Sequence, residues 1–427
     1  MADRHLEAVA VSAVRRTVGG ELGAEGAQVS EAIGTVDGGR RLREVLLLRD
    51  VPEQQQLSME RFADEMERGF AAHPSFRMTA AAMHESAAAA RLGLRRIDSY
   101  VTRFLRYPLA AARRRADIYH IADHGYAHLA AFLPRDRTVV SCHDLMLLKG
   151  EEGAAGFKGR RTSVARFRWS TSYLKKVAHV VCASQSTKED LVRLRSVPEE
   201  RISIVPYGVN SRFQWLGDEV SYRLKAAMAG RRQFAVLHVS TGHPYKNVPV
   251  TLQVVAALRR SAMDVTFVRV GMPLSREERA LAEELRLAAS VIECGRVSDE
   301  RLVELYNACD LLLFPSYYEG FGWPPLEAMA CGTPVVTSNC PSLVEVVGGA
   351  GLVAPPDDVG ALAAAARAVL ESSELAARLR RQGLERAAEY TWERTVTGYA
   401  QVYEMVTEDA RQRQQEDERE RQAACVR

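Results

Sequence analysis

The chain has 427 residues, 47% of them hydrophobic and 26% charged, with a formal net charge of +3. This composition excludes intrinsic disorder as the main state, and the near balance of charge predicts no nucleic-acid partner. No apolar run reaches the roughly 18–20 residues that span a bilayer. Seven scattered cysteines without a CxxC pair predict neither a disulfide framework nor a zinc site. We therefore expect a soluble, cytoplasmic protein of two large domains.

The chain is expected to begin with a flexible extension. Residues 1–41 are rich in glycine and show no sustained periodicity. From 42 to 216, short apolar runs alternate with helical segments, which is the pattern of a parallel sheet with crossover helices. Strands are predicted at 43–49, 117–121, 138–142, 179–183 and 201–205, and helices from about 59 to 70 and at 186–194.

The same alternation restarts after a polar junction near Gly217. A helix is predicted at 219–230, another from about Asp299, and strands at 235–240, 265–271, 311–314, 334–337 and 351–353. Two such halves, 42–216 and 217–395, indicate an α/β protein of two doubly wound, Rossmann-like domains with a facing cleft. Ligands of such sheets bind at the carboxyl ends of the strands, so the cleft is the expected site.

An arginine-rich segment, residues 91–115, lies in the first half. It holds eight arginines and one acidic residue, Asp98, with apolar residues between them. Two interpretations remain open. The favoured one is a helix that faces the core and exposes a basic side to solvent. The other is a basic amphipathic helix that contacts an anionic membrane surface from the cytoplasmic side.

The most informative stretch runs from Phe314 to Val336. A predicted strand ends at Ser316, a Gly320-Phe321-Gly322 turn follows, and a short helix opens at Pro324–Pro325. Glycine lets a ligand approach the backbone closely, and proline suits the first helical turn. The N–H groups around Phe321, Gly322 and Leu326 are therefore expected to point at an anion, aided by the helix dipole.

Two carboxylates flank this phosphate cradle. Glu319 and Glu327 would be repelled by phosphate, so we expect them to accept hydrogen bonds from hydroxyl groups. A diphosphate between a ribose and a sugar satisfies both requirements. The compensating cation is predicted to be Lys246, in a loop directly after a strand of the same half.

These motifs carry a family resemblance. The chain resembles the family 4 retaining glycosyltransferases of the GT-B fold (glycosyl transferases group 1), whose signature sets two glutamates around E-G-F-G-x-P. Supporting segments are Cys182-Ala-Ser-Gln-Ser-Thr-Lys-Glu-Asp190, Val205-Pro-Tyr-Gly-Val-Asn210, Gly295-Arg-Val-Ser-Asp299 and Tyr390-Thr-Trp-Glu393. The resemblance covers roughly residues 117–405.

The resemblance implies a metal-independent hexosyltransferase of carbohydrate biosynthesis that uses a nucleotide-sugar and no other cofactor. It implies that residues 396–427 form a helix that returns to the first domain, followed by a charged tail. By matching position it assigns a catalytic role to His143 and Glu319, and donor binding to Lys246, Arg296, Val297, Gly320, Phe321, Gly322, Leu326 and Glu327. His124 and Asp144 are candidates on the acceptor side.

The chain departs from the family pattern beside the phosphate lysine. Many relatives have an arginine in that loop, whereas Tyr245 precedes Lys246 here. We therefore expect the charge of the donor phosphates to be neutralised by Lys246 and backbone dipoles alone, or by Arg296. The acceptor stays open among saccharides, lipid-linked sugars and small natural products. The alternatives are a nucleotide-sugar epimerase or phosphorylase of the same fold, or a non-catalytic nucleotide-sugar-binding protein.

Overall fold

The computed structural model describes residues 42–54, 57–150, 161–228 and 232–425. The predicted extension at 1–41 lies outside these residues. The first half of the described chain forms a six-stranded parallel sheet in the order β2-β1-β3-β4-β5-β6. Its strands are β1 (Arg43–Leu48), β2 (Phe76–Ala81), β3 (Ile118–Ile121), β4 (Thr138–Cys142), β5 (His179–Cys182) and β6 (Ile202–Ile204).

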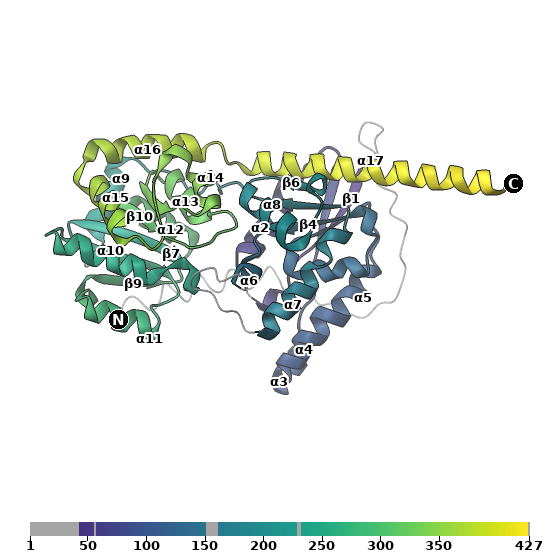
Figure 1. Cartoon of the computed structure of the whole chain (residues 1–427), viewed down its shortest axis with the longest axis horizontal. Coiled ribbons are helices and arrows are strands. Elements are labelled where there is room, and N and C mark those ends of the chain that lie inside the picture. Colours follow the sequence, from purple (N-terminus) through teal and green to yellow (C-terminus); the bar gives the residue numbers. More distant parts are fainter. Residues whose placement is uncertain (1–41, 55–56, 151–160, 229–231, 426–427) are drawn as a thin grey trace, which may run out of the picture. The chain divides into compact units, whose positions relative to one another are not determined.

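The second half forms a second six-stranded parallel sheet, in the order β12-β11-β10-β7-β8-β9 (Figure 1). Its strands are β7 (Phe234–Ser240), β8 (Val265–Gly271), β9 (Val291–Gly295), β10 (Leu311–Phe314), β11 (Val335–Ser338) and β12 (Leu352–Ala354). The α/β architecture of two doubly wound sheets is confirmed.

Helices connect the strands in both halves. Those of the first half are α2 (Leu57–Phe70), α3 (Ala87–Arg91), α4 (Arg95–Val101), α5 (Tyr107–Ala112), α6 (Met146–Lys149), α7 (Arg161–Thr171) and α8 (Gln185–Arg195). Those that follow are α9 (Asp218–Ala227), α10 (Val248–Arg260), α11 (Arg276–Glu284), α12 (Asp299–Ala308), α13 (Trp323–Ala330), α14 (Pro341–Val347), α15 (Val359–Glu371), α16 (Ser373–Ala387) and α17 (Trp392–Cys425).

Short 3-10 segments complete the connections. They are η1 (Pro52–Gln54), η3 (His124–Ala131), η4 (Arg135–Arg137), η6 (Leu174–Lys176), η7 (Glu199–Arg201), η8 (Pro244–Lys246), η9 (Ala288–Ser290) and η10 (Gly348–Ala350), and η2 (Thr102–Arg106) is a π-helical turn.

Two strands, β2 and β9, were missed by the sequence analysis. Both are edge strands, and each pairs with a single neighbour. β2 carries Arg77 and Thr79, and β9 carries Glu293, on sides that are not fully buried. Strands that are covered on only part of their surface need no continuous apolar run, so neither gives the signal by which the inner strands were found.

The inner strands are apolar because both faces of each sheet are covered. On β1, Val45 and Leu47 belong to one buried cluster while Leu46 and Leu48 belong to another. Successive side chains of a strand point to opposite faces, so this division shows one core on each side of the first sheet.

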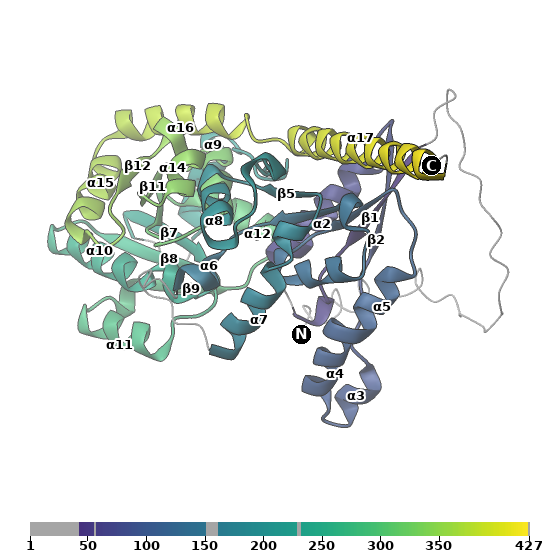
Figure 2. The same ribbon diagram turned by 45° about the vertical axis from the view of Figure 1, so that its right-hand side comes forward.

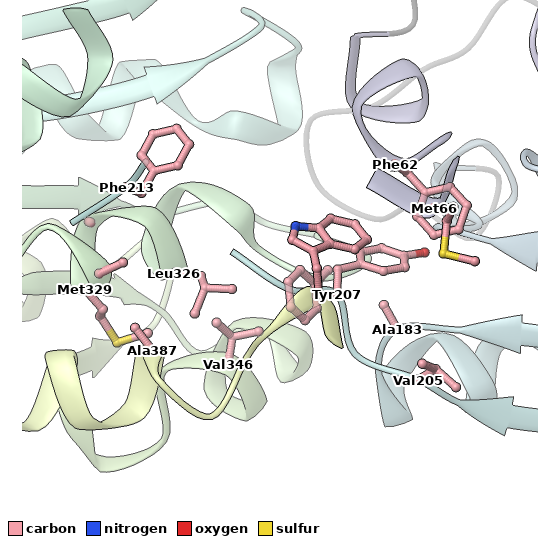
Figure 3. Packing of buried hydrophobic residues seen from close by; sticks show 14 of the residues in the cluster. Phe62, Met66, Ala183, Val205, Tyr207, Phe213, Leu326, Met329, Val346 and Ala387 are labelled. Carbon is pink, nitrogen blue, oxygen red and sulfur yellow. The ribbon is translucent and has the colours of Figure 1, made fainter. Parts of the chain in front are cut away.

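Tyr207 joins the cores of the two halves. Figure 3 shows it with Phe62 and Met66 of α2 at one side and Leu326 and Met329 of α13 at the other, all members of one buried cluster. Its ring centroid lies 5.2 Å from that of Phe62. The connection that carries Tyr207 is hydrogen-bonded to the returning chain, because the Val209 amide donates to the Tyr390 carbonyl at 3.0 Å.

The chain ends in α17, which Figure 2 shows as one unbroken helix. It begins at Trp392, earlier than the predicted position 396, and contacts α2, η4 and β5 of the first half. From Arg411 to Ala424 all of its residues are exposed. Among the residues that the structure describes, no helix is both long and apolar enough to cross a membrane.

The arginine-rich segment forms α3, α4, η2 and α5 in succession. The favoured interpretation of a core-facing helix is wrong for most of its apolar side chains. Exposure is 74% for Leu92, 62% for Ile97 and 55% for Leu105. Tyr107 and Ala111 of this segment are buried in the core on one side of the sheet, whereas Leu92, Ile97 and Leu105 belong to neither core cluster.

We expect Phe62→Ala to lower the free energy of unfolding by about 3–5 kcal/mol, because Phe62 is fully buried among the rings that join the two halves. Phe132→Ala is the matched control, since Phe132 is 48% exposed and its truncation should cost less than about 1 kcal/mol. Chemical denaturation measures both. Equal losses in the two variants would contradict this account of the core.

Candidate active site

The second sheet brings the predicted donor residues together at its topological switch point. Strand order reverses between β7 and β10, which are neighbours in the sheet although they are far apart in sequence. Such a reversal opens a crevice at the carboxyl ends of the two strands. Lys246 follows β7 and Glu319 follows β10. The Lys246 ammonium lies 2.7 and 2.8 Å from the two carboxylate oxygens of Glu319.

The loop that carries Lys246 is held by Asn247. This residue has φ 57°, a left-handed conformation that asparagine tolerates better than most residues. Its side-chain amide donates to the carbonyls of Pro315 at 3.0 Å and Pro356 at 2.6 Å. The loops after β7 and β10 are therefore tied to each other, and the lysine is fixed beside the glutamate.

The glycine turn packs directly against the first half. A Cβ at position 320 would lie 1.8 Å from the His143 carbonyl oxygen, so only glycine fits. The Ser184 hydroxyl, at the start of α8, donates to the Gly320 carbonyl at 2.7 Å. Gly322 has φ 119° and immediately precedes α13. The backbone of the turn is thus fixed from both halves before any ligand binds.

Glu327 lies near the middle of α13 and is 3% exposed. One of its carboxylate oxygens accepts a hydrogen bond from Arg61 of α2 at 2.5 Å, and the other accepts one from the Tyr306 hydroxyl at 3.0 Å. Burial raises the pKa of Glu327, and the opposing effects of Arg61 and Tyr306 cancel this only in part. Its negative charge therefore depends on these two partners.

These residues line one cavity of about 510 Å³, within the range of small-molecule sites. Ten of the twelve predicted site residues line it, namely His143, Asp144, Lys246, Arg296, Val297, Glu319, Gly320, Phe321, Gly322 and Glu327. His124 lies outside the lining. The described residues show no group of three or more His, Cys, Asp or Glu side chains placed to hold a metal ion.

Leu326 is a correction to the predicted cradle. Its side chain is fully buried in the apolar core, and its amide donates to the Gly322 carbonyl at 3.3 Å. This amide is thus part of the opening turn of α13 and does not face an anion.

His143 is placed at the cavity, but both of its ring nitrogens have partners. Nε2 donates to the Ala122 carbonyl at 2.7 Å, and Nδ1 accepts from the Tyr207 hydroxyl at 2.7 Å. Burial lowers the pKa of His143 to about 4, against a smaller opposite effect of Asp123. The imidazole is therefore neutral at pH 7. The expectation that it hydrogen-bonds a sugar is corrected, because neither nitrogen is available in this arrangement.

Two matches to family models cover most of the region in which this geometry lies. Glycosyltransferase Family 4 matches residues 63–213, and Glycosyl transferases group 1 matches residues 228–386. The chain belongs to the group 1 glycosyl transferases. This membership agrees with the prediction from the glutamate signature, and the matches favour a glycosyltransferase over the epimerase, phosphorylase and non-catalytic alternatives.

Curated relatives of this group 1 member include mannosyltransferases. O-antigen chain mannosyltransferase B of Escherichia coli is 30% identical over 245 residues, which are 55% of this chain and 64% of the relative. D-inositol 3-phosphate glycosyltransferase of Rhodococcus jostii is 28% identical, with 69% and 68% covered. The match to mannosyltransferase WbdA of Escherichia coli, at 28% identity, covers 67% of this chain but only 36% of that longer protein.

Solved structures share the fold at low identity. Sucrose-phosphate synthase from Thermosynechococcus elongatus gives a TM-score of 0.66 at 19% identity, covering 85% of this chain and 99% of that one. Anabaena HepE in complex with UDP-glucose gives 0.67 at 17% identity, covering 86% and 100%. Both show that the two-sheet arrangement is that of GT-B glycosyltransferases.

The first half of the chain holds a buried carboxyl pair that the sequence analysis missed. Asp50 follows β1 and Asp123 follows β3, at the switch point of the first sheet. Burial and then the neighbouring Asp123 raise the pKa of Asp50 well above its usual range. Burial also raises the pKa of Asp123, but His124, whose Nδ1 lies 3.0 Å away, outweighs it and makes the net shift downward. Burial thus favours the protonated form of Asp50, while His124 favours the charged form of Asp123.

Arg61 is the other functional candidate that sequence reasoning missed. It lies on α2 beside the apolar stripe of Phe62 and Met66, where charged residues are the rule. Nothing in its local sequence separates it from Arg68 on the same helix. Only the contact with α13, 266 positions away in sequence, distinguishes it.

We expect Gly320→Ala to destabilise the fold by about 1–3 kcal/mol, the usual cost of forcing an extra methyl group into a packed site, because the new Cβ would collide with the His143 backbone. Gly349→Ala is the control, since nothing lies within 4 Å of the added methyl group there. Thermal unfolding compares the variants. A stable Gly320→Ala protein would show that the turn is not held as described.

Proposed function

We propose that the protein transfers a hexose from a nucleotide-sugar to an acceptor hydroxyl, with retention of anomeric configuration and without a metal ion. One observation carries this proposal: a single cavity gathers Lys246, Glu319, Glu327 and the glycine turn at the switch point of the second sheet. The charges of Glu319, Lys246 and Glu327 alternate in sign, which matches a donor whose diphosphate lies between a sugar and a ribose.

In this proposal the Lys246 ammonium leaves Glu319 and pairs with the donor diphosphate. The lysine side chain is 12% and the glutamate side chain 10% exposed, and they form an ion pair with each other, so a phosphate that takes the ammonium releases the carboxylate from this pair. Glu319 then accepts hydrogen bonds from hydroxyl groups of the transferred sugar. The backbone around Phe321 and Gly322, at the start of α13, contributes further positive potential.

The rest of the donor is assigned along the same cavity. Glu327 accepts from the ribose hydroxyls, and the base lies against Arg296 and Val297. Anabaena HepE, which shares the fold, is described in complex with UDP-glucose, and several relatives are named mannosyltransferases. These names support a nucleotide-sugar donor and a hexose as the transferred group.

The proposed step proceeds on one face of the sugar. The bond between the anomeric carbon and the phosphate oxygen breaks, and a bond from the acceptor oxygen to the same face of that carbon forms. The acceptor proton passes to an oxygen of the leaving phosphate. Lys246 stabilises the developing charge, which is usually the largest catalytic contribution. His143 is neutral and fully bonded, so its part is to hold Tyr207 and the wall of the cleft in place.

The acceptor is expected at the carboxyl ends of the first sheet. Asp144 lines the donor cavity from that side, and its carboxylate also accepts from the Met146 amide at 2.9 Å. His124 stands behind it, beside Asp123. We assign these two residues to the acceptor side, for a saccharide, a lipid-linked sugar or a small natural product.

We expect one of UDP, GDP, ADP and dTDP to raise the unfolding midpoint of the wild type, and the same nucleotide to have little effect on Lys246→Ala. A ligand at about 100 times its dissociation constant stabilises a fold by roughly 2.7 kcal/mol. Lys225→Ala is the matched control, because Lys225 also pairs with a carboxylate, Asp310, at 2.9 Å but lies outside this cavity. If the nucleotide raised the unfolding midpoint of Lys246→Ala as much as that of the wild type, the assignment of Lys246 to the diphosphate would be wrong.

We further propose that the arginine-rich segment, residues 91–115, docks on an anionic membrane surface. Most of its large apolar side chains are exposed, and its single acidic residue, Asp98, is buried and bonded to Arg106 at 2.7 Å. The segment therefore presents arginines and apolar side chains together. Apolar insertion and attraction to anionic lipids reinforce each other on such a surface.

We expect the full chain to sediment with vesicles of phosphatidylglycerol but not of phosphatidylcholine, less so as salt is raised. Leu92→Ser with Ile97→Ser should abolish most of this binding. Tyr222→Ser is the control, since Tyr222 is 73% exposed but lies on α9, outside the segment. Unchanged sedimentation of the double variant would contradict the membrane proposal.

A further inference from the structure

Each of the two proposed donor-site glutamates is paired with a cationic side chain of the protein, and the two cations come from different halves of the chain. Glu319 holds Lys246 of its own half. Glu327 holds Arg61, which belongs to α2 of the first half. The proposed ribose carboxylate is thus completed by a residue outside the half that carries it.

The hydrogen bonds of Glu327 leave room for a ligand. A carboxylate offers about four acceptor positions. Arg61 Nη1 takes one on Oε1 at 2.5 Å, and the Tyr306 hydroxyl takes one on Oε2 at 3.0 Å. One position remains on each oxygen, which suits two neighbouring hydroxyl groups. Arg61 therefore does not need to leave for a ribose to bind.

Arg61 is itself held in position. Its Nη2 lies 3.1 Å from Asp299 of α12, and its guanidinium stands 5.2 Å from the Phe213 ring centroid. Arg212 pairs with the other oxygen of Asp299 at 2.9 Å. These contacts fix the guanidinium toward Glu327. The two contacts with Asp299 join α2 and the connection after β6 to the second half, whereas the contact with Phe213 lies within the first half.

Without Arg61, Glu327 would be a buried carboxylate with no cation bonded to it. Its other neighbours are Tyr306 and Asp299 of α12 and the Cys331 thiol after α13, while Lys246, Arg296 and Glu319 line the same cavity. Tyr306 is neutral, Asp299 is itself acidic, and Lys246 is bonded to Glu319. A buried acid in this position takes up a proton more readily, and a protonated acid accepts hydroxyl hydrogen bonds more weakly.

We propose that Arg61 is a positioning residue of the donor site, which supplies from the first half the cation that fixes Glu327 for the ribose hydroxyls. This inference rests on the proposed nucleotide-sugar donor. Since Arg61 reaches Glu327 only when the two halves are in contact, donor binding and that contact must strengthen each other equally.

The test is calorimetric binding of UDP, GDP, ADP and dTDP to the wild type, Arg61→Gln and the control Arg68→Gln, at pH 8.0 and pH 5.5. Arg68 lies on the same helix as Arg61 but outside the cavity. Arg61→Gln should bind the active nucleotide about tenfold more weakly, and its affinity should fall further from pH 8.0 to 5.5, because Glu327 without its cation takes up a proton more readily as the pH is lowered. The wild type and Arg68→Gln should change less with pH. If none of the four nucleotides binds the wild type, the proposed donor is wrong, and the inference that rests on it is overturned with it.

Two further variants separate positioning from a structural effect. Arg61→Lys keeps the charge, so it should restore the weaker pH dependence even if its affinity is reduced. Glu327→Gln cannot ionise, and adding Arg61→Gln to it should cause no further loss of affinity. The 2′,3′-dideoxy form of the active nucleotide should bind wild type and Arg61→Gln alike, since it lacks the hydroxyl groups concerned.

Opposite results would overturn the inference. Tighter nucleotide binding by Arg61→Gln would mean that Arg61 competes with the ribose for Glu327. Unchanged affinity at both pH values would mean that the contact with Glu327 has no part in donor binding. Should Arg61→Gln fail to fold, Arg61→Lys and Glu327→Gln still test the inference. The nucleotide affinity of both variants should change little between pH 8.0 and 5.5, and a marked fall in either would contradict the inference.

Discussion

The cleft of this protein is organised by the need of each buried carboxylate for a cation or a proton. Removing a charge from water is costly unless a partner compensates for it. Glu319 is compensated by Lys246 and Glu327 by Arg61. In the Asp50–Asp123 pair, burial favours the protonated form of Asp50 and His124 favours the charged form of Asp123. Each of these pairs joins two segments distant in sequence, and the Arg61–Glu327 pair joins the two halves.

Topology explains why these charges meet. Both sheets are doubly wound, and in each the strand order reverses once between neighbouring inner strands. The loops that leave these strands must diverge, and the space between them is where polar side chains can face a ligand. Lys246 and Glu319 occupy that position in the second sheet, and Asp50 and Asp123 occupy it in the first. Gly320, which touches the His143 backbone, brings the two positions to one cavity.

The proposed chemistry follows from exchange among these pairs. A diphosphate that pairs with Lys246 frees Glu319 for a sugar, so the site needs no cationic side chain that is unpaired before the donor binds. Glu327 differs because its partner comes from the other half and is itself anchored by Asp299. Donor binding thus becomes sensitive to the contact between the halves, which is a property that neither half has alone. His143, with both nitrogens bonded, supports the wall of the cleft through Tyr207.

The sequence by itself determined the two-sheet α/β architecture, the family and the loops that carry the donor residues. Apolar strand periods and the segment from Glu319 to Glu327 are local patterns that can be recognised without a fold. Only the tertiary structure decided that Leu326 belongs to the core, that His143 is fully bonded, that the edge strands β2 and β9 exist and that residues 91–115 expose most of their large apolar side chains. It alone singled out Arg61. The reason is that burial and ion pairing depend on which segments meet in space, and Arg61 meets Glu327 across 266 positions of sequence.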